Sequence, residues 1–445
     1  KGGFNELQVS WEILNGIKIS AIIDSLSFLL PQQHGIPWAT YVEGKIEDIS
    51  GDALLDVEQG TIIYDGQELI LKGIGGTIQP PNANADEKLQ FSGEMKIHDF
   101  ESAGEKEANQ WMASMLSEAP FSATFTLDNF SSTEFQNGVN ITVPEPAAQI
   151  LKLFQLEAWE MNSKVNVNRK EHASKVEIQG QILLNAGSGM YEGFPYPLHD
   201  ISSRIEFQQS DIKIVYLNAK GSQEAPIHIN GSVIAGKEEL RVDLSLHADG
   251  APLDGTLRGA LSEPIARIMD KLIDHEAYDR IADDLTSKRA SEFRLGGKLD
   301  LDLKIFHDSL IDKGVDLTGE VRFENIGIMH NKFPFPVMVR EGGVRLETDG
   351  LYIPEDKLVR FNGLEHGMGE MTGSIHFLED GSAIPDLSLV LLNENVSSDL
   401  VAAVSDSAGE SHELAAGILG GLGLHSKLNV YGTIIGESSG LIGTH

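Results

Sequence analysis

The C-terminal region has one match to a serine-hydrolase motif. Gly436, Ser438 and Gly440 fit the G-x-S-x-G pattern, in which a strained turn between a strand and a helix exposes a nucleophilic serine. A strand is expected before the motif, over residues 428–435, but only five residues follow Gly440, too few for the helix. The Asp and His of a triad would also have to precede the serine, against the chain order of that hydrolase class. We therefore interpret this segment as a glycine-rich loop.

The other residues that could do chemistry lack the spacing of a known site. Residues 73–76 read Gly-Ile-Gly-Gly without the lysine of a phosphate-binding loop or the G-x-G-x-x-G spacing, so we expect a bulge or turn. The 14 histidines form no pair four residues apart that could hold zinc on a helix, and His228 alternates with apolar residues on a strand. Asp300 and Asp302 share one strand face, where like charges usually meet water. We predict no catalytic residue, no metal and no cofactor.

The charge balance limits the partners. The 445 residues include 67 Asp and Glu against 34 Lys and Arg, a formal net charge of −33. Such acidity argues against nucleic-acid binding and against electrostatic docking on anionic lipid headgroups, which both need clustered cations. Cysteine is absent, which excludes disulfides and thiolate chemistry. A hydrophobic fraction of 41% nevertheless allows a real core, so we expect a folded chain.

Most of the chain has the period of a β-strand. Residues 299–305 alternate leucine or isoleucine with Asp and Lys, and residues 121–127, 242–246 and 387–391 alternate in the same way. One apolar and one polar face per strand is typical of an antiparallel sheet that is wetted on one side. The sequence therefore predicts a mainly β fold, elongated and repeating, with a few peripheral helices.

Helical patterns interrupt the strands in four places. Apolar residues at helical spacing, and in two cases a proline in the expected first turn, mark them. The expected helices cover residues 105–118, 146–156, 263–289 and 410–424. The predicted organisation is a β unit over 1–143 with the first helix, a second β unit over 144–261, a helical insertion over 262–292, and a third β unit over 293–445 with a glycine-rich C-terminal helix.

An internal repeat is the most informative feature. Residues 176–197 and 315–336 align without gaps. The identical pairs are Val176/Val315, Gly180/Gly319, Met190/Met329, Phe194/Phe333, Pro195/Pro334 and Pro197/Pro336. Units of short strands that cannot bury their own faces stack along an axis, so we predict a repeat array. Three separate sandwich domains are the alternative.

The apolar strand faces are the candidate ligand surface. They form either the packed cores of sandwiches or the inner wall of a gutter that shields acyl chains, at about 0.8 kcal/mol per buried methylene. Alternation alone does not separate these two interpretations. The candidate lining residues are Val176, Ile178, Ile182, Leu184, Ile212, Ile214, Ile227, Ile229, Val242, Leu244, Leu246, Leu299, Leu301, Leu303, Ile305, Val321, Phe323, Val344, Leu346, Leu387, Leu389 and Leu391.

Four segments carry a resemblance to a known family. They read FPYP at 194–197, APLDGTLRGAL at 251–261, GGKLDLDL at 296–303 and FPFP at 333–336. Over about 160–395 the chain resembles the AsmA-like proteins of bacterial envelopes, which are related to the repeating-β-groove, bridge-like lipid-transfer proteins. The resemblance implies a taco-like sheet with a hydrophobic groove, phospholipid acyl chains as cargo, and no catalytic residue. It also implies a periplasmic location in the cell envelope, a membrane anchor outside this chain, and a role in intermembrane phospholipid transport and outer-membrane biogenesis.

Two other functions stay open at this point. A structural or adhesive β-repeat protein of the cell surface would have packed sandwiches and no ligand. A polysaccharide-active hydrolase would need paired carboxylates across a cleft and aromatic platforms for sugars. The tryptophans available for such platforms are Trp11, Trp38, Trp111 and Trp159.

Overall fold

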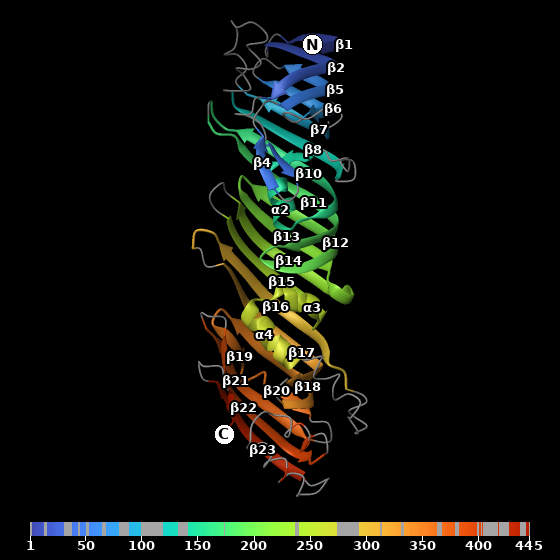
Figure 1. Cartoon of the computed structure of the whole chain (residues 1–445). Helices are drawn as coiled ribbons and strands as arrows, with labels where there is room; N and C mark the ends of the chain where they lie inside the picture. Colours follow the sequence, from blue (N-terminus) through green and yellow to red (C-terminus); the bar gives the residue numbers. More distant parts are fainter. Residues whose placement is uncertain are drawn as a thin grey trace. The chain divides into compact units, whose positions relative to one another are not determined.

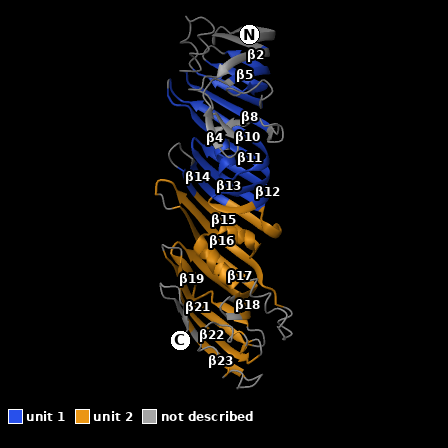
Figure 2. Cartoon of the chain, viewed as in Figure 1, with its two compact units in different colours: residues 1–192, 198–219, 230–242 blue, residues 193–197, 220–229, 243–445 orange. Residues whose placement is uncertain are grey.

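In the computed structural model, the described residues lie mainly in strands (Figure 1). It divides into two compact units, coloured separately in Figure 2. Unit 1 comprises 1–192, 198–219 and 230–242, and unit 2 comprises 193–197, 220–229 and 243–445. The structure describes residues 2–12, 16–30, 38–42, 45–49, 53–64, 68–79, 89–98, 119–131, 141–172, 174–235, 240–273, 293–311, 314–330, 333–362, 367–378, 382–397, 400–401, 403, 417, 427–436 and 442–444.

Unit 1 is an antiparallel sheet in which almost every strand pairs with its neighbour in the chain. The ladder runs β1-β2-β5-β6-β7-β8-β10-β11. The bounds are β1 Gly2–Glu12, β2 Gly16–Leu30, β5 Ala53–Tyr64, β6 Leu69–Gln79, β7 Leu89–Ile97, β8 Phe121–Ser131, β10 Glu157–Arg169 and β11 Glu177–Tyr191. On β8 the predicted apolar set, Phe121, Ala123, Phe125 and Leu127, is buried, as period-2 alternation requires.

A helix and a small second sheet complete unit 1. The helix α2 (Glu145–Leu153) contacts β3 (Trp38–Val42), β4 (Lys45–Ile49) and β9 (Ile141–Pro144). These three strands form their own antiparallel sheet in the order β4-β3-β9. Ala148 and Leu151 of α2 are completely buried, so the helix is held by packing along one face.

Four strands between residues 194 and 252 contribute residues to both units. They are β12 Phe194–Gln208, β13 Asp211–Lys220, β14 Pro226–Ala235 and β15 Leu240–Pro252, with a short 3-10 turn, η3 Ser222–Glu224, between β13 and β14. Burial alternates through Leu246 on β15, so that stretch presents one apolar and one polar face. On β13 the alternation shifts by one residue between Ile214 and Leu217.

Unit 2 is also built mainly of antiparallel strands, and its described residues include two helices. Its strands are β16 Gly296–Asp308, β17 Val315–His330, β18 Phe333–Glu347, β19 Gly350–Ile353, β20 Val359–Asn362, β21 Met368–Phe377, β22 Ala383–Asn395, β23 Lys427–Gly436 and β24 Ile442–Thr444. The helices are α3 (Gly255–Ala260) and α4 (Glu263–Leu272). Asp254 caps α3 by accepting hydrogen bonds from the backbone of Thr256 and Leu257, both at 3.0 Å.

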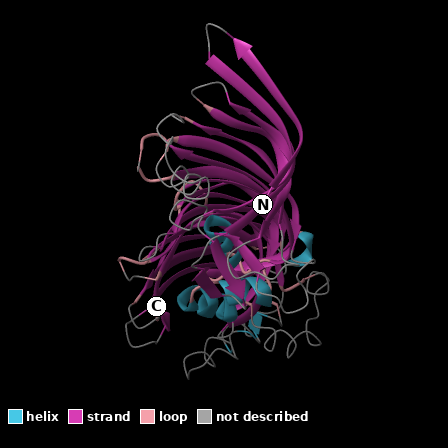
Figure 3. Cartoon of the chain, turned by 90° about the horizontal axis from the view of Figure 1, so that it is seen from above, coloured by secondary structure: helices cyan, strands magenta, loops and turns pink. Residues whose placement is uncertain are grey.

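The predicted fold class is confirmed: the chain is mainly β and antiparallel, with few helices (Figure 3). The helix expected at 146–156 is α2, and the one expected at 263–289 begins as α4, which ends at Leu272. Residues 274–292, the helix expected at 105–118 and, apart from Gly417, the one expected at 410–424 lie outside the described residues. The taco-like curl and the four-part domain division stay predictions.

The internal repeat corresponds to the same local structure twice. Residues 176–197 cover β11 and the start of β12, and residues 315–336 cover β17 and the start of β18. The Phe-Pro-aromatic-Pro segment opens the second strand in both copies, where a proline removes few ladder hydrogen bonds. The repeat is thus a strand, a short turn and a second strand.

The glycine shared by both copies allows close approach of the neighbouring strand. A Cβ on Gly180 would lie 2.4 Å from the carbonyl oxygen of Lys164, and one on Gly319 would lie 2.1 Å from that of Asp302. Gly319 also has a φ of +139°, which side chains rarely adopt. Both positions therefore require glycine for a steric reason.

We expect Gly319→Ala to destabilise the protein by about 2–4 kcal/mol, from the clash and the backbone strain together. Gly343→Ala is the matched control, because its Cβ would meet nothing closer than 3.4 Å and its φ is ordinary. Urea unfolding followed by circular dichroism measures both. Equal midpoints for the two variants would contradict the steric explanation.

Candidate functional site

The registers of unit 2 join the apolar positions of successive strands into one surface. Leu301 on β16 lies opposite Val321 on β17, and Val321 lies opposite Val344 on β18. Residues directly opposite in an antiparallel pair point to the same side of the sheet. Leu299, Leu303 and Ile305 are aligned in the same way with Phe323, Gly319 and Leu317.

The same surface extends across the following strands. Leu346 lies opposite Leu351 on β19, and Leu351 lies opposite Ile375 on β21. On β22 the partners are Leu387, opposite Gly373, and Leu389, opposite Met371. We call this surface the apolar face of unit 2: Leu299, Leu301, Leu303, Ile305, Leu317, Gly319, Val321, Phe323, Val344, Leu346, Leu351, Ile353, Met371, Gly373, Ile375, Leu387, Leu389 and Leu391.

Exposure changes along this face. On β16, Leu301, Leu303 and Ile305 are 4%, 2% and 1% exposed, so this part is closed by packing. From β17 onward most positions are partly exposed, namely Leu317, Val321, Phe323, Val344, Leu351, Ile353, Met371, Ile375, Leu387 and Leu389. Soluble proteins rarely leave a row of aliphatic side chains partly exposed to water across several neighbouring strands.

The face is closed again toward one end of these strands. The helix α4 contacts β17, where Ile326 and Met329 are buried. On β18, Phe335 packs with Leu400 and Ala403 in a small core. The open part of the apolar face therefore lies beside packed regions in unit 2.

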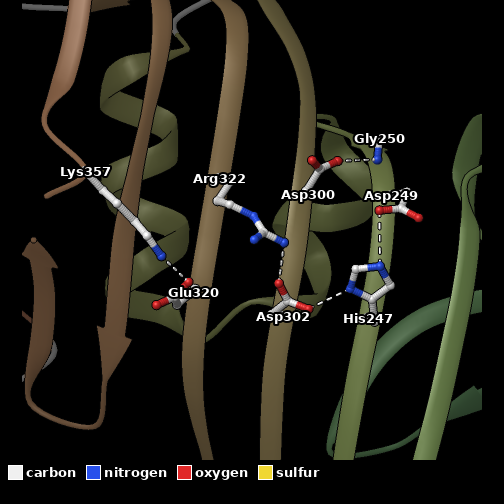
Figure 4. A network of polar contacts seen from close by, with 8 residues as sticks. All are labelled: His247, Asp249, Gly250, Asp300, Asp302, Glu320, Arg322 and Lys357. Carbon is white, nitrogen blue, oxygen red and sulfur yellow. Dashed lines mark hydrogen bonds and ion pairs between the residues drawn. The ribbon is translucent and has the colours of Figure 1, made fainter.

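The opposite side of the same strands is polar and ion-paired (Figure 4). Arg322 on β17 donates to Asp302 on β16, and Lys357 donates to Glu320. Asp300 accepts a hydrogen bond from the backbone of Gly250 at 2.9 Å. These side chains are between about a third and a half exposed, so each pair is screened by water and adds little stability. Asp300 and Asp302 thus each contact a neighbouring strand on the wet side.

His247 on β15 is the titratable centre of this polar side. Its Nδ1 lies 2.6 Å from Asp302 Oδ1, and its Nε2 lies 3.1 Å from Asp249 Oδ1. The hydrogen bond to Asp302 is the main cause that raises the pKa of His247 above 6.5; desolvation and Arg322 oppose it. His228, which alternates with apolar residues on β14, is exposed, and its ring stacks on that of His247 with centroids 6.4 Å apart.

We expect this histidine to make stability depend on pH. The folded state binds the proton of His247 more tightly than the unfolded state does. The stability that this proton contributes is therefore fully present below about pH 6.5 and is lost as pH rises through the raised pKa of His247. His247→Gln should remove this part of the pH dependence. Urea unfolding of both proteins between pH 6 and 9 measures it, and parallel curves for the two would contradict the assignment.

The predicted lining residues fall into two groups. A closed group is under 9% exposed: Ile178, Ile182, Leu184, Ile212, Ile214, Ile227, Ile229, Val242, Leu244, Leu246, Leu299, Leu301, Leu303, Ile305, Leu346 and Leu391. An open group is partly exposed: Val176, Val321, Phe323, Val344, Leu387 and Leu389. The apolar face adds Leu317, Leu351, Ile353, Met371 and Ile375, which sequence reasoning missed. These five residues alternate with polar ones in the sequence. Their alignment with the apolar positions of β16 becomes visible only when the pairing of the strands is known.

The motif-like segments have ordinary structural roles where they are described. Residues 73–76 lie inside β6 beside a register shift between Leu71 and Ile74, with Gly73 at a φ of +60°, so the expected bulge is confirmed. Residues 437–440 of the G-x-S-x-G segment lie outside the described residues.

Among the described residues, each helix is too short or too polar to cross a bilayer. The sheet of unit 2 thus has an aliphatic side and an ion-paired side. Such a sheet can cover apolar material on one side and face water on the other. Comparison of the chain with family models, curated proteins and solved structures found no match.

Proposed function

We propose that this chain is a non-enzymatic lipid-binding segment of an envelope protein, which shields acyl chains on the apolar side of a β-groove during phospholipid transport between membranes. One observation carries the proposal: the register-matched apolar face of unit 2 is partly exposed from β17 to β22. Water-soluble proteins seldom leave such a surface uncovered, and those that do usually bind something apolar.

Elementary energetics support acyl chains as the ligand. Each methylene moved from water to an apolar surface gains about 0.8 kcal/mol, so one long chain needs no hydrogen bonds to be retained. The face offers no strong hydrogen-bonding side chain, since its aligned positions on β16–β22 carry only aliphatic residues, one phenylalanine, one methionine and glycine. A periplasmic location, which the family resemblance implies, is part of the same proposal.

A structural β-repeat protein is the second candidate, and a specific observation favours it. Most candidate lining residues before β17 are closed by packing, for example Leu244 at 1% and Ile214 at 1% exposure. A sheet filled with its own side chains holds no cargo in that stretch. A sugar-binding role has less support, because Trp159 is 2% exposed and belongs to the core.

Lipid extraction and mass spectrometry on protein purified without detergent tests the proposal. We expect phospholipid to co-purify in stoichiometric amounts and to survive gel filtration. A folded chain that is empty after expression in a bacterial envelope, and stays empty after incubation with vesicles, would favour the structural alternative.

A further inference from the structure

The exposure pattern of unit 2 divides its apolar face into a closed and an open part. Leu303 and Ile305 on β16 are 2% and 1% exposed, whereas their register partners on β17, Gly319 and Leu317, are partly exposed. Hydrophobic packing is therefore complete on β16 and incomplete one strand later. A ligand cannot enter a part that is already filled at native density.

From this we infer that the acyl-chain site is confined to β17–β22, and that its ligand is a lipid without net negative charge. The inference rests on the proposed function and adds its location and the class of headgroup. On β17–β22 the partly exposed positions lie on successive paired strands, so they can contact one extended chain. Beyond Ile326 the packing around α4 and Phe335 ends the site.

Phe323 lies within the open part of the apolar face and combines packing with exposure. Its ring lies over Gly342, where a Cβ would come within 2.9 Å of Phe323 Cε2, and yet Phe323 stays partly exposed. The ring is therefore packed near the backbone of Gly342 and is still partly open to solvent. Aromatic and aliphatic surface in this arrangement suits methylene chains rather than sugars or peptides.

Charge decides the headgroup. The chain carries a formal net charge of −33, which repels anionic lipids. Arg322, Lys357 and Arg360 lie on the opposite, polar side of these strands, where they pair with Asp302, with Glu320, and with Glu341 and Glu370. The aligned positions of the apolar face carry no cation, so a phosphate with net negative charge has no partner there. A zwitterionic headgroup meets no such penalty.

Tryptophan placed at the site and quenched by lipids with brominated acyl chains tests the inference. Phe323→Trp reports from the open part, and Leu389→Trp is a second reporter on another strand in case the first fails to fold. Tyr431→Trp is the matched control, because Tyr431 lies opposite Val390, on the polar side, and is 70% exposed. The parent chain, with four tryptophans, gives the baseline.

With brominated phosphatidylcholine vesicles, we expect the fluorescence added at 323 or 389 to be lost, while that added at 431 persists. Brominated phosphatidylglycerol should quench several-fold less. Co-purified lipid without quenching at 323 and 389 would overturn the location and leave the proposed function standing. Equal quenching by both lipids would overturn the headgroup class. A chain that retains no lipid and shows no quenching would refute both proposals.

Discussion

Leu303→Asp is expected to prevent unit 2 from folding. Leu303 is 2% exposed, and its neighbours on the same strand face, Leu301 and Ile305, are closed as well. A carboxylate there loses its hydration without gaining a partner, and the packing of a leucine is lost in addition, so the cost exceeds about 4 kcal/mol. That is a large part of the stability of an ordinary domain. Circular dichroism and limited proteolysis should show an unfolded C-terminal region.

Leu389→Asp is expected to behave differently, although it is the same exchange on the same apolar face. Leu389 is partly exposed, so the new carboxylate keeps part of its water and we expect the chain to stay folded. If acyl chains cover this position, the charge should reduce co-purifying lipid at least about tenfold, the effect of 1.4 kcal/mol.

Ser388→Asp is the matched control for that experiment. Ser388 is the adjacent residue on β22, is exposed, and faces the polar side opposite Thr372. It adds the same charge to the same strand and should leave the lipid content unchanged. Equal lipid loss in both variants would show that net charge, and not the apolar face, controls binding.

Arg169→Met is expected to destabilise unit 1 by about 2–4 kcal/mol, because it removes a buried donor from polar groups that stay buried. Arg169 is 1% exposed at the end of β10, and burial lowers the pKa of its guanidinium. It donates to the carbonyl oxygens of Ala119 and Ser174, both at 3.2 Å, and its guanidinium lies 5.2 Å from the ring centre of Phe121.

Arg169→Lys separates charge from geometry. Lysine keeps the charge but cannot bond both carbonyls with one planar group, so an intermediate loss of stability is expected. The urea midpoints of the parent, Arg169→Lys and Arg169→Met proteins measure the order of their stabilities. If the methionine variant were as stable as the parent, the hydrogen bonds of Arg169 would contribute nothing net.

The sequence predicted the fold class well because alternation is a local property. The set Leu299 to Ile305 was correctly placed on one face, since a period of two residues needs no knowledge of partners. The internal repeat can also be recognised from the sequence alone, because it needs only a comparison of two segments. The close approach of the neighbouring strand at Gly180 and Gly319 explains why this glycine is identical in both copies.

The candidate site was harder to predict because it depends on pairing. Whether Val344 is open and Leu346 closed is decided by strands and helices distant in sequence, and both residues alternate identically. Leu351 and Ile375 were missed because β19 has only four residues and β21 mixes glycine, Thr and Ser with its apolar positions. Arg169 was missed because charged residues are rarely buried, although a period of two residues from Val165 and Val167 places it on the buried face of β10.

The ladder order of both units also has a kinetic consequence. Almost every strand pairs with the one before and after it, from β5 to β8 in unit 1 and from β16 to β18 in unit 2. Sequence separation between contacting residues is therefore short for an all-β chain, and short separations favour fast folding. Folding can start at any hairpin and grow strand by strand. Such a chain can also lengthen in evolution by duplicating a hairpin without redesigning its core.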